Sequence, residues 1–187
     1  MEEREVVIKR YDVFNSRGAR RLLNSFYKSH DLKGRRITEE RDRKENAVYL
    51  LVYEKYRKSN PLYWFGKKLV GVGRISQYPS EGVIEESGVF DILGKKYTKD
   101  EIKNMCGGWL ATAKNKETLT DLLEEGEKCA RNLMGKGLLI TGVREEQREL
   151  YEEMGWNAGR RTTLIISSPG YFKTVEKLNV EWLYKLI

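Results

Sequence analysis

The chain has 187 residues, a length that usually corresponds to one domain and allows a core large enough to need no disulfide or metal. Charged residues make up 34% of it and hydrophobic residues 40%, and the net charge is +7, so we expect a single globular domain over residues 1–187 with a heavily charged surface. The two cysteines, Cys106 and Cys129, and the single His30 lack the spacing of metal ligands, and no run approaches the roughly 20 apolar residues of a membrane span, which argues against a zinc protein and a transmembrane protein.

The first part of the chain predicts a strand, a helix and a loop. Residues 5–11 carry β-branched residues at their centre, which is typical of a strand. Asn15 or Ser16 can cap a following helix, in which apolar residues recur at helical spacing. Residues 29–46 are polar and charged, and we expect them to form a long loop.

The middle of the chain predicts three strands and an irregular segment. Residues 47–53 and 67–75 are rich in β-branched and apolar residues, and the turn signal between them predicts an antiparallel hairpin. Residues 76–105 contain a proline and several glycines, so we expect irregular structure with one short helix. Residues 107–113 predict a fourth strand.

The last part predicts two helices, two strands and a tail. Leucines and other apolar residues follow a helical pattern over residues 119–134, and a short buried strand follows at 138–141. Residues 144–153 predict a short charged helix, and 161–167 predict a strand. We expect the C-terminal tail, residues 170–187, to form a loop and a short terminal helix.

This order of elements resembles that of the Gcn5-related acyltransferases. The match is best over residues 118–156, where a long helix, a strand and a short helix lead to Tyr151 and the ending Gly155-Trp156. The resemblance implies an α/β fold with a mixed, mostly antiparallel sheet flanked by helices. Because a helix connects them, we expect the strands at about 108–113 and 138–142 to be adjacent, parallel and splayed. In the family the acyl donor enters that gap.

The resemblance also implies roles for residues around the gap. A thioester donor, either acyl-CoA or an acyl carrier protein, would lie along the fourth strand, whose free N–H groups can polarise its carbonyl; the residues are Trp109, Leu110, Ala111 and Thr112. Phosphates would bind at the start of the following helix, where the family's glycine-rich turn is replaced by a stretch that includes Lys114, Asn115, Lys116 and Thr118. Tyr151 would protonate the departing thiolate, or else serve as a packing residue.

A narrower resemblance, to the acyl-homoserine-lactone synthases, runs through residues 17–112. Glu40, Asp42 and Glu45 precede a Tyr-Leu strand as that family's acidic motif does, and Arg74 ends a Val-Gly-x-x-Arg sequence. The resemblance implies that these residues position a cationic amine such as S-adenosylmethionine; a charged surface loop is the alternative. Since the start of one hairpin strand faces the end of the next, we predict that Arg74 pairs with at least one of the acids.

The sequence leaves the base, the acceptor and the partner open. Leu110 stands where the lactone synthases have a glutamate, so deprotonation of the amine would need Glu85, Glu86 or water.

Between Arg17 and Lys44 ten basic residues stand against four acidic ones, which indicates either a solvated face or a docking surface for a coenzyme phosphate, an acidic acyl carrier protein or a nucleic acid. A small-molecule amine is the expected acceptor, and a nucleic-acid-directed protein is the alternative. The charged N-terminus and the two lone thiols favour a cytoplasmic location.

Overall fold

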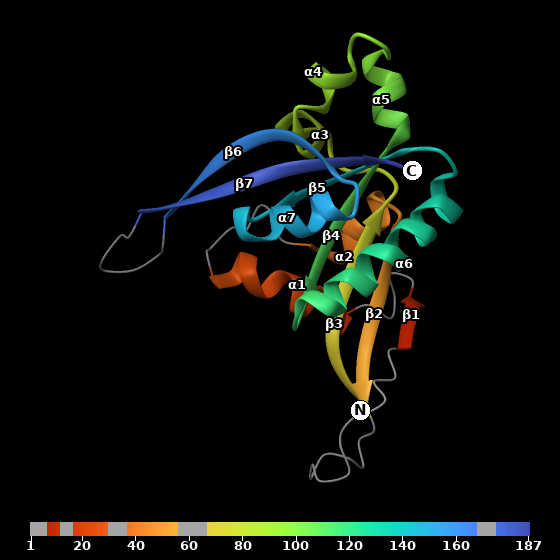
Figure 1. The fold of residues 1–187 in the computed structure, drawn as a ribbon, viewed down its shortest axis with the longest axis vertical. Helices are drawn as coiled ribbons and strands as arrows, with labels where there is room; N and C mark the ends of the chain where they lie inside the picture. The colour runs from red at the N-terminus through yellow and green to blue at the C-terminus, as the bar shows by residue number, and fades with distance from the viewer. Residues whose placement is uncertain (1–6, 12–16, 30–36, 56–66, 168–174) are drawn as a thin grey trace.

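The described part of the chain is built on a sheet of seven strands in the spatial order β1-β2-β3-β4-β5-β7-β6 (Figure 1). The structure, a computed structural model, describes residues 7–11, 17–29, 37–55, 67–167 and 175–187. Among the described strands only β4 and β5 run parallel to each other, which confirms the mixed, mostly antiparallel sheet. The strands are β1 (Val7–Tyr11), β2 (Ala47–Lys55), β3 (Lys67–Ser76), β4 (Cys106–Ala113), β5 (Leu138–Val143), β6 (Asn157–Ser167) and β7 (Val175–Leu186).

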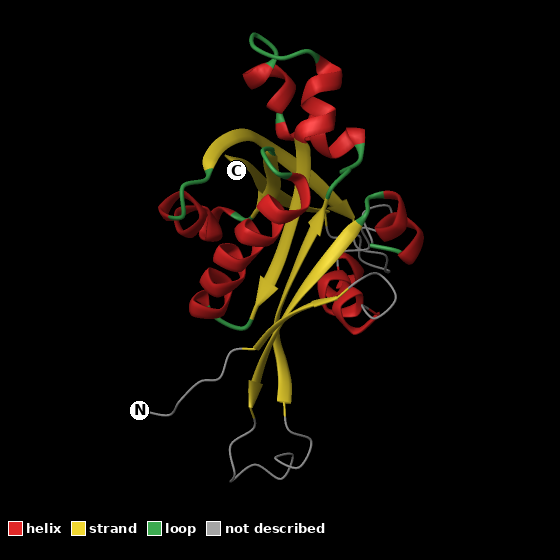
Figure 2. Cartoon of the chain, turned by 90° about the vertical axis from the view of Figure 1, so that its right-hand side faces the viewer, coloured by secondary structure: helices red, strands yellow, loops and turns green. Residues whose placement is uncertain are grey.

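Helices stand on both sides of the sheet (Figure 2). One long helix, α6, packs against β2, β3 and β4. α1 contacts β3 and β4 through a separate apolar cluster, and α2 lies against β2. Three short helices between β3 and β4 cover the part of the sheet formed by β5, β7 and β6. The described helices are α1 (Arg17–Ser29), α2 (Glu39–Lys44), α3 (Glu81–Ser87), α4 (Val89–Leu93), α5 (Lys99–Met105), α6 (Lys116–Met134) and α7 (Glu145–Glu153).

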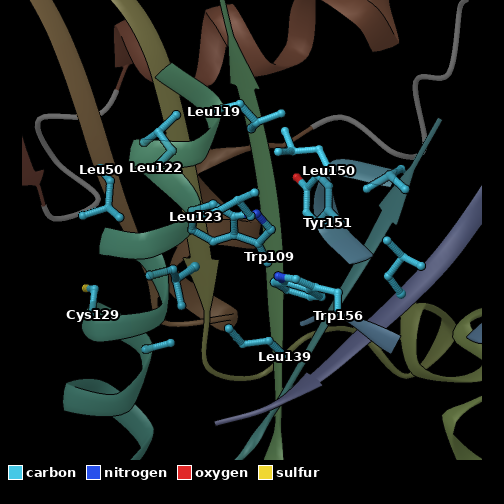
Figure 3. Packing of buried hydrophobic residues seen from close by; sticks show 14 of the residues in the cluster. Leu50, Trp109, Leu119, Leu122, Leu123, Cys129, Leu139, Leu150, Tyr151 and Trp156 are labelled. Atoms are coloured by element: carbon cyan, nitrogen blue, oxygen red, sulfur yellow. The ribbon is translucent and has the colours of Figure 1, made fainter. Parts of the chain in front are cut away.

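Trp109 of β4 is a central residue of the core beneath α6 (Figure 3). Its ring fits because two neighbours lack side chains: a Cβ would lie 2.7 Å from the ring at Gly73 of β3 and 2.4 Å from it at Gly126 of α6. The leucines of α6 that recur at helical spacing, among them Leu122 and Leu123, complete this core. The predicted helix therefore forms where expected and packs through its predicted face.

β4 and β5 part soon after they begin to pair. The parallel register joins residues 106–108 of β4 to residues 138–140 of β5 and ends there. Beyond that point β4 continues to pair with β3 up to Ala113, and β5 pairs with β7 up to Val143. The expected adjacent, parallel and splayed pair of strands is confirmed.

The C-terminal tail was predicted incorrectly. Residues 175–186 form β7, which lies between β5 and β6 in the sheet, instead of a loop and a short helix. The sequence does carry the signal, because apolar residues alternate from Leu178 to Leu186, which is the period of a strand. Leu183 interrupts the alternation, because it is an apolar residue at one of the positions in between.

Two segments expected to be irregular contain helices. α2 lies inside the predicted loop at 29–46, of which residues 30–36 are outside the described part. The segment 76–105 holds three helices where one was expected. One of them, α5, begins with a capping box between Thr98 and Glu101, which the spacing of these two residues in the sequence already indicates.

None of the described helices is long and apolar enough to cross a membrane. Within the same residues, no group of His, Cys, Asp or Glu side chains is arranged to hold a metal ion. Cys106 and Cys129 are both buried as free thiols, and burial raises the pKa of Cys106 to about 12.

Candidate functional site

A cleft of about 620 Å³ lies where β4 and β5 part. Residues 108–112 of β4 and 140–143 of β5 line its long sides, and α3 contributes Val83 and Glu86. The edges of the two strands that no longer pair with each other face this space. Main-chain N–H groups on such an edge can hold an amide-bearing ligand and polarise a carbonyl.

One part of the cleft wall carries Arg74, which is held by two carboxylates. Its Nε donates to Oδ1 of Asp42 at 2.8 Å, and its Nη2 donates to Oε2 of Glu45 at 2.9 Å. The predicted ion pair between Arg74 and the acidic motif is therefore present. Arg74 and Glu45 both line the cleft, so the pair borders it.

Three further side chains complete this network. The Tyr49 hydroxyl lies 3.0 and 2.9 Å from the two carboxylate oxygens of Asp42, and Arg20 Nη1 donates to the same carboxylate at 3.1 Å. Arg41 Nε donates to Oε1 of Glu45 at 2.8 Å. Each buried carboxylate thus has more than one donor, as a charge removed from water requires.

Burial sets the protonation of the network. Asp42 is 0% exposed and Arg74 4%. Burial alone would lower the pKa of Arg74, but the attraction of Glu45, Tyr49 and Asp42 outweighs it and raises that pKa. Burial also raises the pKa of Tyr49, so its hydroxyl keeps the proton that it donates to Asp42.

Local capping places α2 beside β3. Thr38 accepts a hydrogen bond from the Arg41 N–H and starts the helix. Asn24 of α1 bonds both the N–H and the C=O of Ile37, at 2.8 and 2.7 Å, which fixes the chain just before α2. Asp42 and Glu45 are three residues apart, so both reach the same neighbour across the turn.

The remaining predicted acids separate. Glu40 is exposed and pairs with Lys44 at 2.8 Å, and the hydrogen bond from that lysine lowers its pKa. Glu86 lines the cleft, whereas Glu85 is exposed and borders a different hollow beside Phe90 and Arg160. Of the two candidate bases, only Glu86 therefore lies at the cleft.

The turn before α6, predicted to bind phosphate, lies outside the cleft lining. Asn115 caps the helix by accepting from the Thr118 N–H at 2.9 Å. Thr118 is 0% exposed, and its methyl group packs where Gly71 has no side chain. Lys114 pairs with Glu54 at 3.1 Å, and Lys116 pairs with Glu153 at 3.3 Å. The phosphate role stays a prediction that rests on the two exposed lysines.

Tyr151 lies in the core and is 2% exposed (Figure 3). Its ring meets that of Trp156 edge to face, with the centroids 5.5 Å apart. Burial raises the pKa of its hydroxyl to about 12, and the indole N–H of Trp109 offsets part of the rise. The Trp109 N–H lies on the side of the Tyr151 hydroxyl (Figure 3), but it makes no hydrogen bond of good geometry with any described residue. Tyr151 is not part of the cleft lining, and its role as an acid stays a prediction.

Several cleft residues were not singled out from the sequence. Arg41, Ser76 and Trp182 line the cleft, but they come from α2, β3 and β7. Of these elements, α2 lies in a segment that was predicted as a loop, and β7 lies in a segment that was predicted as a tail. Arg21 and Phe26 of α1 correspond loosely to an arginine and a phenylalanine on the first helix of the lactone synthases. Arg21 is exposed, and the side chain of Phe26 is outside the described residues.

No protein-family model matches the sequence, and no curated protein sequence matches it. Solved structures do match. An acetyltransferase of the GNAT family from Streptococcus pneumoniae has a TM-score of 0.55 at 15% identity, over 98% of this chain and 100% of that one. Arabidopsis thaliana NAA60 in complex with acetyl-CoA has a TM-score of 0.59 at 13% identity, over 98% and 99%.

A third structure, of mutant forms of the spermidine/spermine N-acetyltransferase SpeG from Vibrio cholerae, has a TM-score of 0.51 at 14% identity and covers 97% of this chain and 95% of that one. The protein therefore has the GNAT fold, the fold of the Gcn5-related acyltransferases, as the order of its elements predicted. At this level of identity the likeness is one of fold. The narrower resemblance to the lactone synthases stays a prediction.

Proposed function

We propose that the protein is an N-acyltransferase that moves an acyl group from an acyl-CoA thioester to a small-molecule amine in the cytoplasm. The observation that carries the proposal is the cleft that opens where β4 and β5 part. Arabidopsis thaliana NAA60, which shares the fold, was crystallised with acetyl-CoA, and the other two similar structures are acetyltransferases. A thioester donor fits such a cleft because its arm carries amides that can bond to a strand edge.

The proposed reaction needs few groups. The free amine attacks the thioester carbonyl carbon, and the resulting oxyanion is stabilised by N–H groups on the edge of β4. When the carbonyl re-forms, the C–S bond breaks, and the amide and the thiol are released. Glu86 or water takes the proton from the amine. Tyr151 or water gives a proton to the thiolate.

A steric block tests where the donor binds. Thr112 is a half-buried residue of the cleft, whereas Thr163 is an exposed residue of β6 outside it. We expect Thr112→Trp to weaken acetyl-CoA binding about tenfold or more in isothermal titration, and the matched control Thr163→Trp to leave it unchanged. The proposal is wrong if the wild type binds no acyl-CoA thioester, or if both variants bind like the wild type.

The second candidate is the lactone-synthase reaction with S-adenosylmethionine as the amine. The Arg74 network favours it, because that network joins the acidic motif to the end of β3 and borders the cleft. We expect S-adenosylmethionine binding, measured by titration, to be lost in Glu45→Gln and kept in the exposed control Glu40→Gln. If the wild type does not bind this ligand, or if both variants bind it equally well, the candidate is rejected.

An acyl carrier protein is the alternative donor, and a nucleic acid is the alternative partner. Both would dock on the basic segment 17–44. Four of its described cations are already paired with carboxylates, which weakens the field that they present; these are Arg20, Arg41, Arg43 and Lys44. Tight binding of DNA or RNA that falls steeply with salt, or turnover with an acylated carrier protein but not with acyl-CoA, would favour these alternatives.

A further inference from the structure

A buried hydroxyl lies at the closed end of the splay, and the proposed reaction does not yet use it. Ser76 is the last residue of β3, is 2% exposed and lines the cleft. It pairs with Gly108 of β4, and Gly108 is the last β4 residue that pairs with β5. Ser76 therefore lies beside the point where the two strands part.

The side chain of Ser76 is directed over that point. A Cβ on Gly108 would lie 2.4 Å from Ser76 Oγ. The hydroxyl therefore occupies the space that the side chain of any residue other than glycine would take at position 108. Ser76 and Arg74 are two positions apart on one strand, so their side chains share a face of the sheet. Arg74 lines the cleft as well, which places the hydroxyl on the cleft side of β3.

The Ser76 hydroxyl also has unused hydrogen-bonding capacity. Within the described part of the chain, no hydrogen bond of Ser76 Oγ is found, and this oxygen is not among the fully enclosed side-chain atoms that lack a partner, so it is open to the cleft, although the hydroxyls of buried residues are normally bonded. Ser87 shows the usual case, since it is 1% exposed and donates to the Ile84 carbonyl at 2.6 Å. An unused donor at the end of a ligand cleft is suited to a ligand oxygen.

We propose that the Ser76 hydroxyl is a catalytic residue that donates a hydrogen bond to the carbonyl oxygen of the bound thioester. The inference rests on the proposed acyl transfer. A donor whose phosphates lie near the start of α6, and whose arm follows β4 from Thr112 back towards Trp109, brings its thioester to Gly108. The hydroxyl then meets the carbonyl oxygen at the place where its negative charge develops.

Ser76 keeps its proton throughout the step. As the amine nitrogen bonds to the carbonyl carbon, the C=O electron pair moves onto oxygen, and the Ser76 O–H stabilises this oxyanion. The pair returns when the C–S bond breaks, and the thiolate leaves and takes a proton from Tyr151 or water. A nucleophilic role is not supported, because a serine nucleophile needs a base within hydrogen-bond reach, and no described titratable side chain bonds to Ser76 Oγ.

The test compares Ser76→Ala with Ser87→Ala, an equal change at a buried serine outside the cleft lining. We expect Ser76→Ala to lower kcat about tenfold to a thousandfold with little change in acetyl-CoA affinity or in melting temperature. Ser87→Ala should keep the wild-type kcat. If Ser76→Ala keeps it too, or if its kcat, donor affinity and melting temperature all fall together, the assignment is wrong.

The affinities of two unreactive ligands give a second test, because a purely structural role of Ser76 would not change the preference for one ligand over the other. One is a ketone analogue of acetyl-CoA in which a methylene replaces the sulfur, and the other is S-ethyl-CoA, which lacks the carbonyl oxygen. The wild type should bind the ketone more tightly, and Ser76→Ala should lose that preference; an undiminished preference contradicts the assignment.

A wild type that binds these ligands but transfers no acyl group from acetyl-CoA to any amine would overturn the proposed function and the catalytic role together. An active wild type with an unaffected Ser76→Ala variant would overturn the role of Ser76 alone.

Discussion

Asp42, Glu45 and Glu40 have the same charge and lie within six residues of one another, but they occupy different environments. Asp42 and Glu45 are buried against Arg74, whereas Glu40 is exposed beside Lys44. The contact with Arg74 was predictable, because a hairpin brings the start of β2 to the end of β3. Which acids take part was not, because that depends on α2, a short helix buried through ion pairs and not through an apolar face.

Loss of the Asp42 charge should destabilise the fold. Asp42→Asn leaves Arg74 and Arg20 buried or partly buried with one counter-charge fewer, and breaking a buried pair typically costs about 3–5 kcal/mol. The control Glu40→Gln breaks an exposed pair and should cost about 0–1 kcal/mol. Urea denaturation measures both free energies of unfolding. Similar small losses in the two variants would contradict a structural role for the buried network.

Tyr151 should make the fold sensitive to alkali. Its pKa is raised from the usual 10.0 to about 12 by burial, so above pH 10 the unfolded chain loses this proton before the folded chain does. The stability tied to Tyr151 is complete below pH 10 and is lost as the pH rises towards 12, with a total of about 2–3 kcal/mol. Tyr151→Phe should flatten the fall in the free energy of unfolding between pH 9 and 12. An unchanged slope would place the hydroxyl in contact with water.

Among the elements, those with strong apolar periodicity were predictable and those held by other forces were not. The long helix α6 and the strands β2, β3 and β5 follow their patterns closely. β7 was missed because Leu183 interrupts the alternation of its apolar residues, and α2 was missed because it has no apolar face. Within the site, the edge of β4 was foreseen, whereas Ser76 was not, since a serine at a strand end carries no signal of its own.

The packing of α6 on the sheet depends on Gly126. Gly126→Ala would put a methyl group about where the Trp109 ring lies, 2.4 Å away, and overpacking of this kind typically costs about 1–3 kcal/mol. The same change at Gly82, an exposed position of α3 with no neighbour within 4 Å, should stabilise by up to about 1 kcal/mol. Thermal unfolding of the two variants checks the opposite signs. A neutral Gly126→Ala would mean that α6 shifts freely on the sheet.

The start of α6 should contribute to donor binding through its lysines. Replacing Lys114 and Lys116 with alanine should weaken acetyl-CoA binding several-fold, and more at low salt, where the attraction to phosphates is least screened. Lys128 is an exposed lysine farther along the same helix, so Lys128→Ala is the control for net charge. Titrations at low and high salt that show equal affinities for all variants would remove the phosphate role from this turn.

At the scale of the whole molecule, the cleft is built from segments that are far apart in the sequence. α1, α2, α3 and α7 and the strands β3, β4, β5 and β7 all contribute lining residues. The order of elements was enough to predict the fold and the splay. The shape of the cleft could not be predicted, because it depends on α3, which lies in a segment expected to be largely irregular, and on β7, which was expected to be a tail.

A crystal structure with a bound acyl-CoA, or with its ketone analogue, tests the central claim most directly. We expect the arm of the donor to bond to the main chain of β4 between Trp109 and Thr112, with the carbonyl oxygen beside Ser76 and the phosphates near Lys114 and Lys116. A donor bound elsewhere on the molecule, or a cleft that stays empty at saturating donor concentration, would contradict the assignment of this cleft as the site of acyl transfer.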